Sequence, residues 1–149
     1  MTKSISEILK EANDIESVAD RIEFLHKNNS NGLQTILAIC FNDEVKSLLP
    51  KGAPPYKSFR GTESKGMLYS TQHLNKLKIF FEGNGYDTIK QAKREALFIG
   101  FLETLDSADA ELIVSIKDKD MPYRKISKSF IEKAFPDIAR KNVSSDANV

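Results

Sequence analysis

Hydrophobic residues recur at intervals of three and four along most of the chain, which is the spacing of helices with one buried face. Three such stretches lie in the first third, and each follows a residue that can cap a helix. They are residues 5–12 after Ser4, 18–28 after Ser17, and 31–41 after Ser30 or Asn31. Glu7 completes the pattern of a capping box with Ser4. The third stretch is apolar on most sides, which predicts a central position in the fold.

Four more helices are predicted in the second half. They are residues 71–81 after Ser70 or Thr71, a longest helix of residues 88–105 from Thr88, 108–116 after Ser107, and 128–135 after Ser127. Gly83 and Pro136 follow two of these stretches, where glycine and proline commonly end helices. No stretch alternates as a strand would. The prediction is an all-α fold, a compact bundle of about six to seven helices, with a single domain over 1–141 and a disordered tail at 142–149.

A long irregular segment separates the two groups of helices. Between residues 42 and 70 the helical pattern is broken by prolines and glycines, as in the stretch KGAPPYKSFRGTESKG. Loops of this length in a small domain are usually functional or mobile. The segment is basic and carries two aromatic residues, Tyr56 and Phe59, so we treat it as a candidate contact surface.

The formal net charge of +1 hides an uneven distribution. Residues 46–78 and 117–141 carry net charges of +6 and +4, whereas residues 1–45 and 79–116 each carry −4. If the fold brings the two basic segments together, they form one positive face suited to a nucleic acid. The alternative is that each is an ordinary solvated face.

The residues that catalysis or metal binding would require are scattered. His26 and His73 lie far apart and Cys40 stands alone, so no metal site is predicted. Asp118 and Asp120 lack the glycine and distal glutamate of a calcium loop. We therefore predict a non-catalytic protein with no catalytic residue, no cofactor and no metal. An enzyme assembled from residues distant in sequence stays open as a third possibility.

The composition also bears on where the protein acts. A single cysteine cannot form an internal disulfide, which is typical of reducing compartments. No apolar run approaches the roughly 20 residues needed to cross a bilayer, and the opening MTKSISEILKEAND lacks the apolar core of a signal peptide. We expect a cytoplasmic protein with no membrane partner, in the host cytoplasm if it is viral.

The most informative stretch is KDKDMPYRKISKSFIEKAFP, residues 117–136, which predicts a helix end, a basic turn and a second helix. Cations crowded at such a turn can hold a phosphate backbone. The predicted phosphate contacts are Lys117, Lys119, Arg124, Lys125, Lys128 and Lys133, with Lys51, Lys57, Arg60 and Lys65 of the long loop as a second set. Helix starts near Ser107 and Ser127 are expected to orient backbone N–H groups towards phosphates.

The order of these elements resembles the N-terminal, all-helical DNA-binding domain of phage-type ATP-dependent DNA ligases. ISEILKEANDI, ESVADRIEFLHKNN and NGLQTILAICFND resemble that domain's first three helices, and SKGMLYSTQHLNKLKIFF resembles its long loop and next helix. The end of the chain is closest to the family pattern: Lys119-Asp120-Met121 opens the turn, Ser127 follows, and Ile131, Lys133 and Pro136 match Ile-x-Lys-x-x-Pro. The resemblance covers residues 4–138.

Two departures from the family limit what the resemblance implies. The sequence has no Lys-x-Asp-Gly adenylation motif, so ligation by that mechanism is not expected. The glycine of the ligase turn is missing, and Pro122, Tyr123, Arg124 and Lys125 stand in its place. The implied protein is a free-standing relative of the ligase domain from a bacteriophage, in which Arg124 and Lys125 contact DNA through their side chains.

Two functions follow as expectations. The first is a nucleic-acid-binding accessory protein that contacts the phosphate backbone with little sequence specificity, with duplex DNA favoured. The second is a protein–protein interaction module that kept the fold and lost DNA, with a polymerase, replisome or virion protein as its partner. Aromatic residues often anchor protein interfaces, so Tyr56, Phe59 and Tyr123 are the candidate contacts for this alternative.

Overall fold

Each of the first three predicted helices forms behind its capping serine. The computed structural model describes residues 3–58 and 62–140, and α1 (Ile5–Asn13), α2 (Val18–Lys27) and α3 (Asn31–Phe41) open this part of the chain. The side chains of Ser4, Ser17 and Ser30 each accept a backbone N–H from the first turn, and Ser4 forms the expected capping box. In α3, nine of the eleven residues are buried, which confirms its predicted central position.

The middle of the chain forms shorter helices than the pattern predicts. A 3₁₀-helix, η1 (Thr62–Tyr69), leads into α4 (Thr71–Lys76), which Ser70 caps and which continues as the 3₁₀-helix η2 (Leu77–Phe80). Phe81 is already extended, and an isolated antiparallel bridge joins it to Ser47. This bridge ties the long loop to the end of η2.

The longest helix, α5 (Gln91–Glu103), begins three residues later than predicted. Thr88 does not start it, because residues 86–89 form a turn in which the N–H of Ile89 bonds to the carbonyl of Tyr86. The side chain of Arg94 stabilises this turn: it is 3% exposed and donates to the carbonyls of Ile79 and Tyr86. Arg94 lies on the buried face of the helix with Phe98 and Leu102, whereas Leu97 lies 39% exposed.

The last part of the chain contains α6 (Ser107–Ile116), α7 (Lys128–Ala134) and the 3₁₀-helix η3 (Ile138–Arg140). Asp106, not the predicted Ser107, caps α6 by accepting the N–H of Ala108. Ser127 caps α7 as predicted. The expected tail, residues 142–149, lies outside the described residues.

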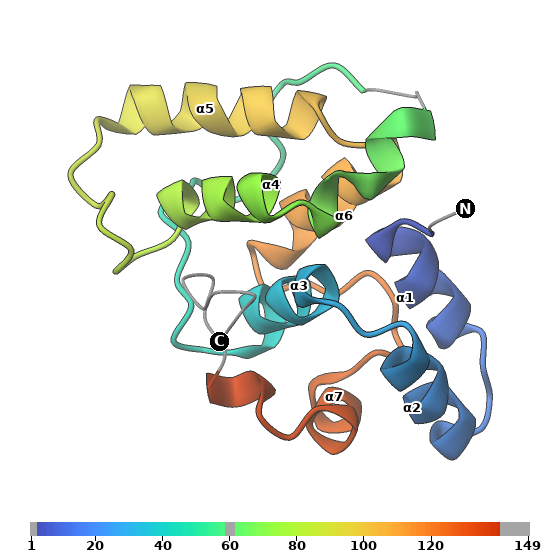
Figure 1. Ribbon diagram of the computed structural model, residues 1–149. Coiled ribbons are helices and arrows are strands. Elements are labelled where there is room, and N and C mark those ends of the chain that lie inside the picture. Colours follow the sequence, from blue (N-terminus) through green and yellow to red (C-terminus); the bar gives the residue numbers. More distant parts are fainter. Residues whose placement is uncertain (1–2, 59–61, 141–149) are drawn as a thin grey trace.

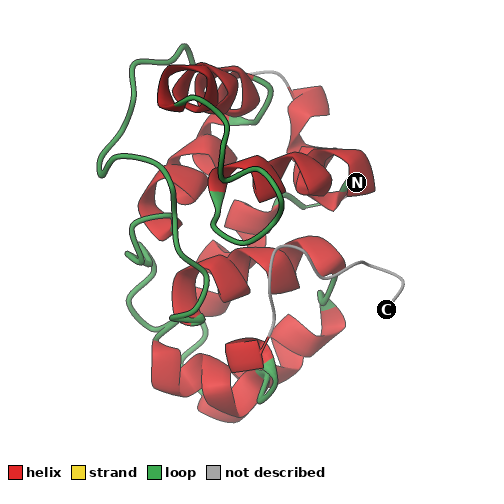
Figure 2. Cartoon of the chain, turned by 90° about the vertical axis from the view of Figure 1, so that its left-hand side faces the viewer, coloured by secondary structure: helices red, strands yellow, loops and turns green. Residues whose placement is uncertain are grey.

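These helices form two groups that share one hydrophobic core. In Figure 1, α4 and α5 lie side by side above α3, α1 lies beside α3, and α2 and α7 lie below it; Figure 2 shows the same division from the side. Helix α6 contacts α1, α3 and α5, so it joins the groups. No strand or sheet occurs in residues 3–58 and 62–140, which confirms the predicted all-α bundle.

The described part of the long loop is attached to the helices at several points. The N–H of Gly52 donates to Asp118, the N–H of Lys57 donates to Glu103, and the carbonyl of Leu48 accepts from the side chain of Gln91. These bonds run from residues 48–57 to both ends of α5 and to the end of α6. The loop is therefore held against the bundle along this stretch.

Candidate anion-binding site

The turn between α6 and α7 has a defined shape because both of its halves are anchored. Met121 and Ile126 are 8% and 1% exposed and insert into the core. The N–H of Lys125 donates to the Oδ1 atom of Asn13, at the end of α1, over 2.8 Å. Ser127 then caps α7 by accepting the N–H of Phe130. The backbone that carries Arg124 and Lys125 is thus fixed relative to α1 and α7.

A surface hollow of about 250 Å³ lies where this turn and α7 meet α2. We call it the basic hollow, and its lining residues are Val18, Arg21, Arg124, Lys125, Ser127, Ser129, Phe130 and Lys133. Four of them are cations, two carry hydroxyl groups, and none is a carboxylate. This composition suits an anion, because both charge and hydrogen-bond donors are supplied from one concave surface.

Arg21 is the buried cation of the basic hollow, with an exposed fraction of 6%. Its Nε and Nη2 atoms donate to the carbonyl of Ile15 over 3.0 and 2.7 Å, and Nη2 also donates to that of Glu16. Its guanidinium lies over the ring of Phe130 at 4.9 Å. These contacts hold the group rigidly, and its Nη1 atom makes no hydrogen bond to the described part of the chain. Arg21 therefore offers a pre-oriented donor.

The exposed cations of this region differ in their partners. Arg124 and Lys133 are exposed and form no ion pair with any described residue. Lys125 pairs with Glu16 at 2.6 Å, and Lys128, outside the hollow, pairs with Asp43 at 2.9 Å. Because exposed pairs of this kind contribute little free energy, an incoming anion can replace Glu16 at Lys125.

Two of the predicted phosphate contacts are engaged elsewhere, which corrects the prediction. Lys117 is 3% exposed, and its ammonium donates to the carbonyl of Pro50 and to Asp118. The ammonium of Lys119 donates to the carbonyls of Ile39 and Asn42, over 2.6 and 2.8 Å, at the C-terminal end of α3. Both lysines hold the bundle together and neither lines the basic hollow.

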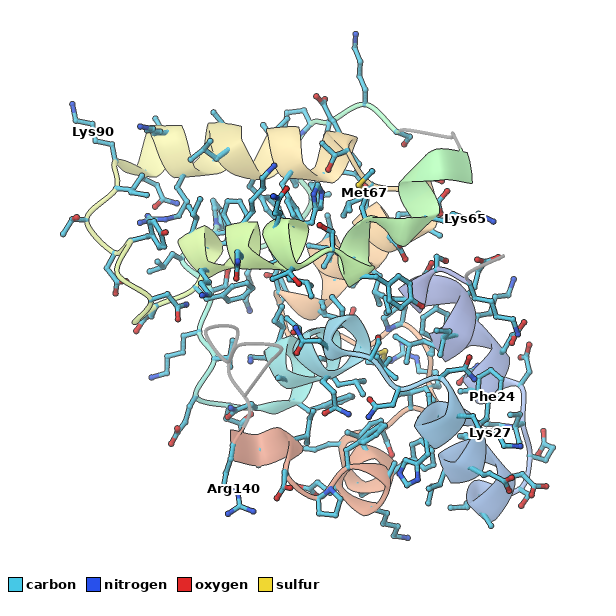
Figure 3. All side chains as sticks on the ribbon, in the orientation of Figure 1. Phe24, Lys27, Lys65, Met67, Lys90 and Arg140 are labelled. Carbon is cyan, nitrogen blue, oxygen red and sulfur yellow. The ribbon has the colours of Figure 1, made fainter. Side chains whose placement is uncertain are left out.

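The predicted loop residues lie apart from the basic hollow. Lys51 lines a different hollow beside Phe98, and Lys65 pairs with Glu7 near the start of α1 (Figure 3). Lys57 is exposed and its backbone is bonded to Glu103. Arg60 lies outside the described residues. Lys51 shares its hollow with Lys117 and Glu95, whereas no described cation of the loop lines the basic hollow, so the two basic segments do not meet there.

Two of the three aromatic residues predicted for a protein interface, Tyr56 and Tyr123, are not free anchors. Tyr56 and Tyr123 are partly buried and pack against the core, and burial raises the pKa of both hydroxyls. Phe59 lies outside the described residues. The ring of Tyr56 therefore belongs to the contact between the loop and the bundle.

The other titratable groups do not form a site with the basic hollow. Burial raises the pKa of the Cys40 thiol to about 12 and lowers that of His73. Asp109 is fully buried: its Oδ1 atom accepts the N–H of Ser6, its Oδ2 atom has no partner, and burial raises its pKa to about 6. Within the described residues, no group of three or more His, Cys, Asp or Glu could hold a metal ion.

Sequence reasoning missed Arg21 and Ser129 as members of the basic hollow. Ser129 follows the predicted cap by two residues, so the local motif contained it. Arg21 lies about a hundred residues away in an acidic segment, and only the packing of α2 on α7 brings it into the hollow. Nothing in the local sequence around Arg21 signals this contact.

Comparison with known proteins gives a family for the chain. Residues 8–123 match the family model DUF6433, described as a family of unknown function, and the chain belongs to this family. No curated protein and no solved structure matches it. The matched region includes Arg21 and ends immediately before Arg124, so most of the basic hollow lies beyond it. In the part of the chain that the structure describes, no helix is long and apolar enough to cross a membrane.

Proposed function

We propose that the protein is a non-catalytic nucleic-acid-binding accessory protein that holds phosphate groups in the basic hollow. The observation that carries this proposal is the convergence of Arg21, Arg124, Lys125 and Lys133 on one concave surface that no carboxylate lines. Phosphates are the anions best matched to several cations and hydroxyl donors at once. The resemblance of the turn and α7 to the ligase DNA-binding domain favours duplex DNA as the ligand.

The chemistry of the hollow supports backbone contact rather than reading of the bases. Its donors are long cations and two serine hydroxyls, which neutralise phosphates and release counterions. Its lining presents no exposed aromatic ring for stacking, since Phe130 is 6% exposed beneath Arg21. Binding is therefore proposed to have little sequence specificity and to depend steeply on salt. The resemblance further suggests a phage protein acting in the cytoplasm of its host.

The test is fluorescence anisotropy with labelled duplex, nicked and single-stranded DNA at two salt concentrations. The variant Arg124→Glu with Lys133→Glu is expected to weaken binding by about tenfold or more, or roughly 1.4 kcal/mol. Glu16→Gln releases Lys125 from its ion pair and is expected to strengthen binding severalfold at low salt.

A matched control is Lys76→Glu with Lys93→Glu, which makes the same change in net charge on α4 and α5. Figure 1 shows these helices on the opposite side of the bundle from α2 and α7. The control should retain nearly wild-type affinity. No measurable binding at low salt, or equal losses in the two double variants, would remove the basic hollow as the nucleic-acid site.

A further inference from the structure

A second concave surface, of different chemistry, lies between α4, η2 and α5. This apolar groove has a volume of about 320 Å³ and is lined by His73, Lys76, Ile79, Phe80, Ala96, Leu97, Gly100, Phe101 and Thr104. Figure 1 shows α4 and α5 running side by side in the upper group. None of these residues belongs to the basic hollow, so the two surfaces can be tested independently.

The floor of the apolar groove is preorganised by aromatic packing. Phe101 stacks on the imidazole of His73 at 4.9 Å and lies 5.9 Å from the ring of Phe80. The Nε2 atom of His73 lies 2.7 Å from the hydroxyl oxygen of Thr104, which donates to the carbonyl of Phe101. Because these polar groups are paired with each other, the floor presents a mainly apolar surface that needs no rearrangement to receive a ligand.

The α5 side of the groove is open to solvent. Leu97 is 39% exposed, one of few large apolar side chains of the described residues with such exposure. Ala96 and Gly100 beside it are also exposed, and a Cβ atom placed on Gly100 would meet no heavy atom within 4 Å. The groove thus has room for an apolar side chain from another molecule. Burial of Leu97 by such a side chain would be favourable.

The charges around the groove indicate what kind of segment it fits. Lys76 lines it, and Lys93 lies on the same face of α5, one turn before Leu97. Both lysines are exposed, and neither pairs with a carboxylate of the described residues. No acidic residue lines the groove. A segment seated there would therefore be favoured if it carried negative charge beside its apolar side chains.

We propose that the apolar groove docks a short segment of a partner protein, with apolar side chains between α4 and α5 and a carboxylate at Lys76 and Lys93. The proposal is independent of nucleic-acid binding, since it uses the other side of the bundle. A second copy of this chain is the competing occupant. If a second copy occupied the groove, the purified chain would associate with itself in solution when no other protein is present.

The test uses a random peptide library displayed on phage, selected on the full chain and counter-selected on Gly100→Leu. The leucine is designed to fill the groove, and the open space at Gly100 leaves the fold intact, which circular dichroism verifies. Peptides with apolar residues next to Asp or Glu are expected to be enriched. Their affinity should fall by about tenfold or more on Lys76→Glu with Lys93→Glu, and stay unchanged on Arg124→Glu with Lys133→Glu.

Three results would overturn the proposal. One is that no selected peptide distinguishes the wild type from Gly100→Leu. Another is that the selected peptides lack carboxylates, or that they bind the Lys76 and Lys93 variant as tightly as the wild type. The third comes from sedimentation equilibrium: self-association of the wild type that Gly100→Leu abolishes would assign the groove to a second copy. If the Arg124 and Lys133 variant loses DNA binding, the peptide-binding and sedimentation results are unaffected, so the two proposals are judged separately.

Discussion

The buried carboxyl of Asp109 predicts a specific dependence of stability on pH. It lies in the first turn of α6, accepts one hydrogen bond from the N–H of Ser6, and has a second oxygen without a partner. Burial raises its pKa from 3.8 to about 6, and the nearby Asp106 and Glu7 carboxylates act in the same direction. Tyr69 and Tyr123 lie close enough for their own pKa values to respond to Asp109, and no cation of the described residues pairs with its carboxylate.

The sign of the effect follows from which state holds the proton. Between about pH 4 and pH 6 the folded chain keeps a proton on Asp109 that the unfolded chain has lost, so the free energy of unfolding falls as pH rises through this window. A pKa difference of about two units corresponds to roughly 3 kcal/mol at neutral pH. Asp109→Asn removes this dependence, while the amide oxygen can still accept the N–H of Ser6.

The assay is urea unfolding of the wild type and Asp109→Asn, followed by circular dichroism across this pH range. Any fixed cost of the new amide is the same at all pH values. Glu16 and Asp43, whose pKa values are lowered by ion pairs distant from Asp109, oppose the effect equally in both proteins. The stability of the variant relative to the wild type should therefore rise by about 2–3 kcal/mol from pH 4 to pH 7. Parallel stability curves would refute the assignment of a raised pKa to Asp109.

Two further predictions concern residues that hold the bundle together. Lys119→Met keeps the aliphatic stem but removes the ammonium that bonds to the carbonyls at the end of α3. The free energy of unfolding, measured in urea, should fall by about 1–2 kcal/mol. An unchanged midpoint would show that water replaces the ammonium at these carbonyls. Gly32→Ala would place a Cβ atom 2.2 Å from the carbonyl oxygen of Leu68, so we expect a loss of about 2 kcal/mol or more by thermal unfolding. Gly100→Ala, which meets nothing within 4 Å, should not destabilise, and equal effects of the two alanines would contradict this reasoning.

The parts of the fold that depend on local interactions could be predicted from the sequence. A capping serine bonds to an N–H three residues away, so Ser4, Ser17 and Ser127 mark helix starts without any knowledge of tertiary structure. The predicted helix start at Thr88 was wrong because hydrogen bonds from a later residue hold this part of the chain in a turn. The buried guanidinium of Arg94 takes its acceptors from Ile79 and Tyr86, and this keeps the preceding residues in a turn.

The candidate site was predictable only in part, for the same reason. Arg124, Lys125 and Lys133 belong to one local motif, so sequence reasoning found them together. Lys119 belongs to that motif as well, but it has a left-handed backbone with φ of 64°, and its ammonium caps a helix about eighty residues away. Arg21 joins the site only through the packing of α2 on α7. These long-range contacts decide which cations line the basic hollow and which bond to carbonyls of the bundle.

The most direct test of phosphate binding in the basic hollow is the salt dependence of duplex DNA affinity. The logarithm of the association constant should fall linearly with the logarithm of salt concentration, with a slope set by the number of phosphates neutralised. For Arg124→Gln with Lys133→Gln, we expect a slope that is shallower by about two than that of the wild type. An unchanged slope, together with unchanged affinity, would contradict the central claim that these two cations contact phosphates.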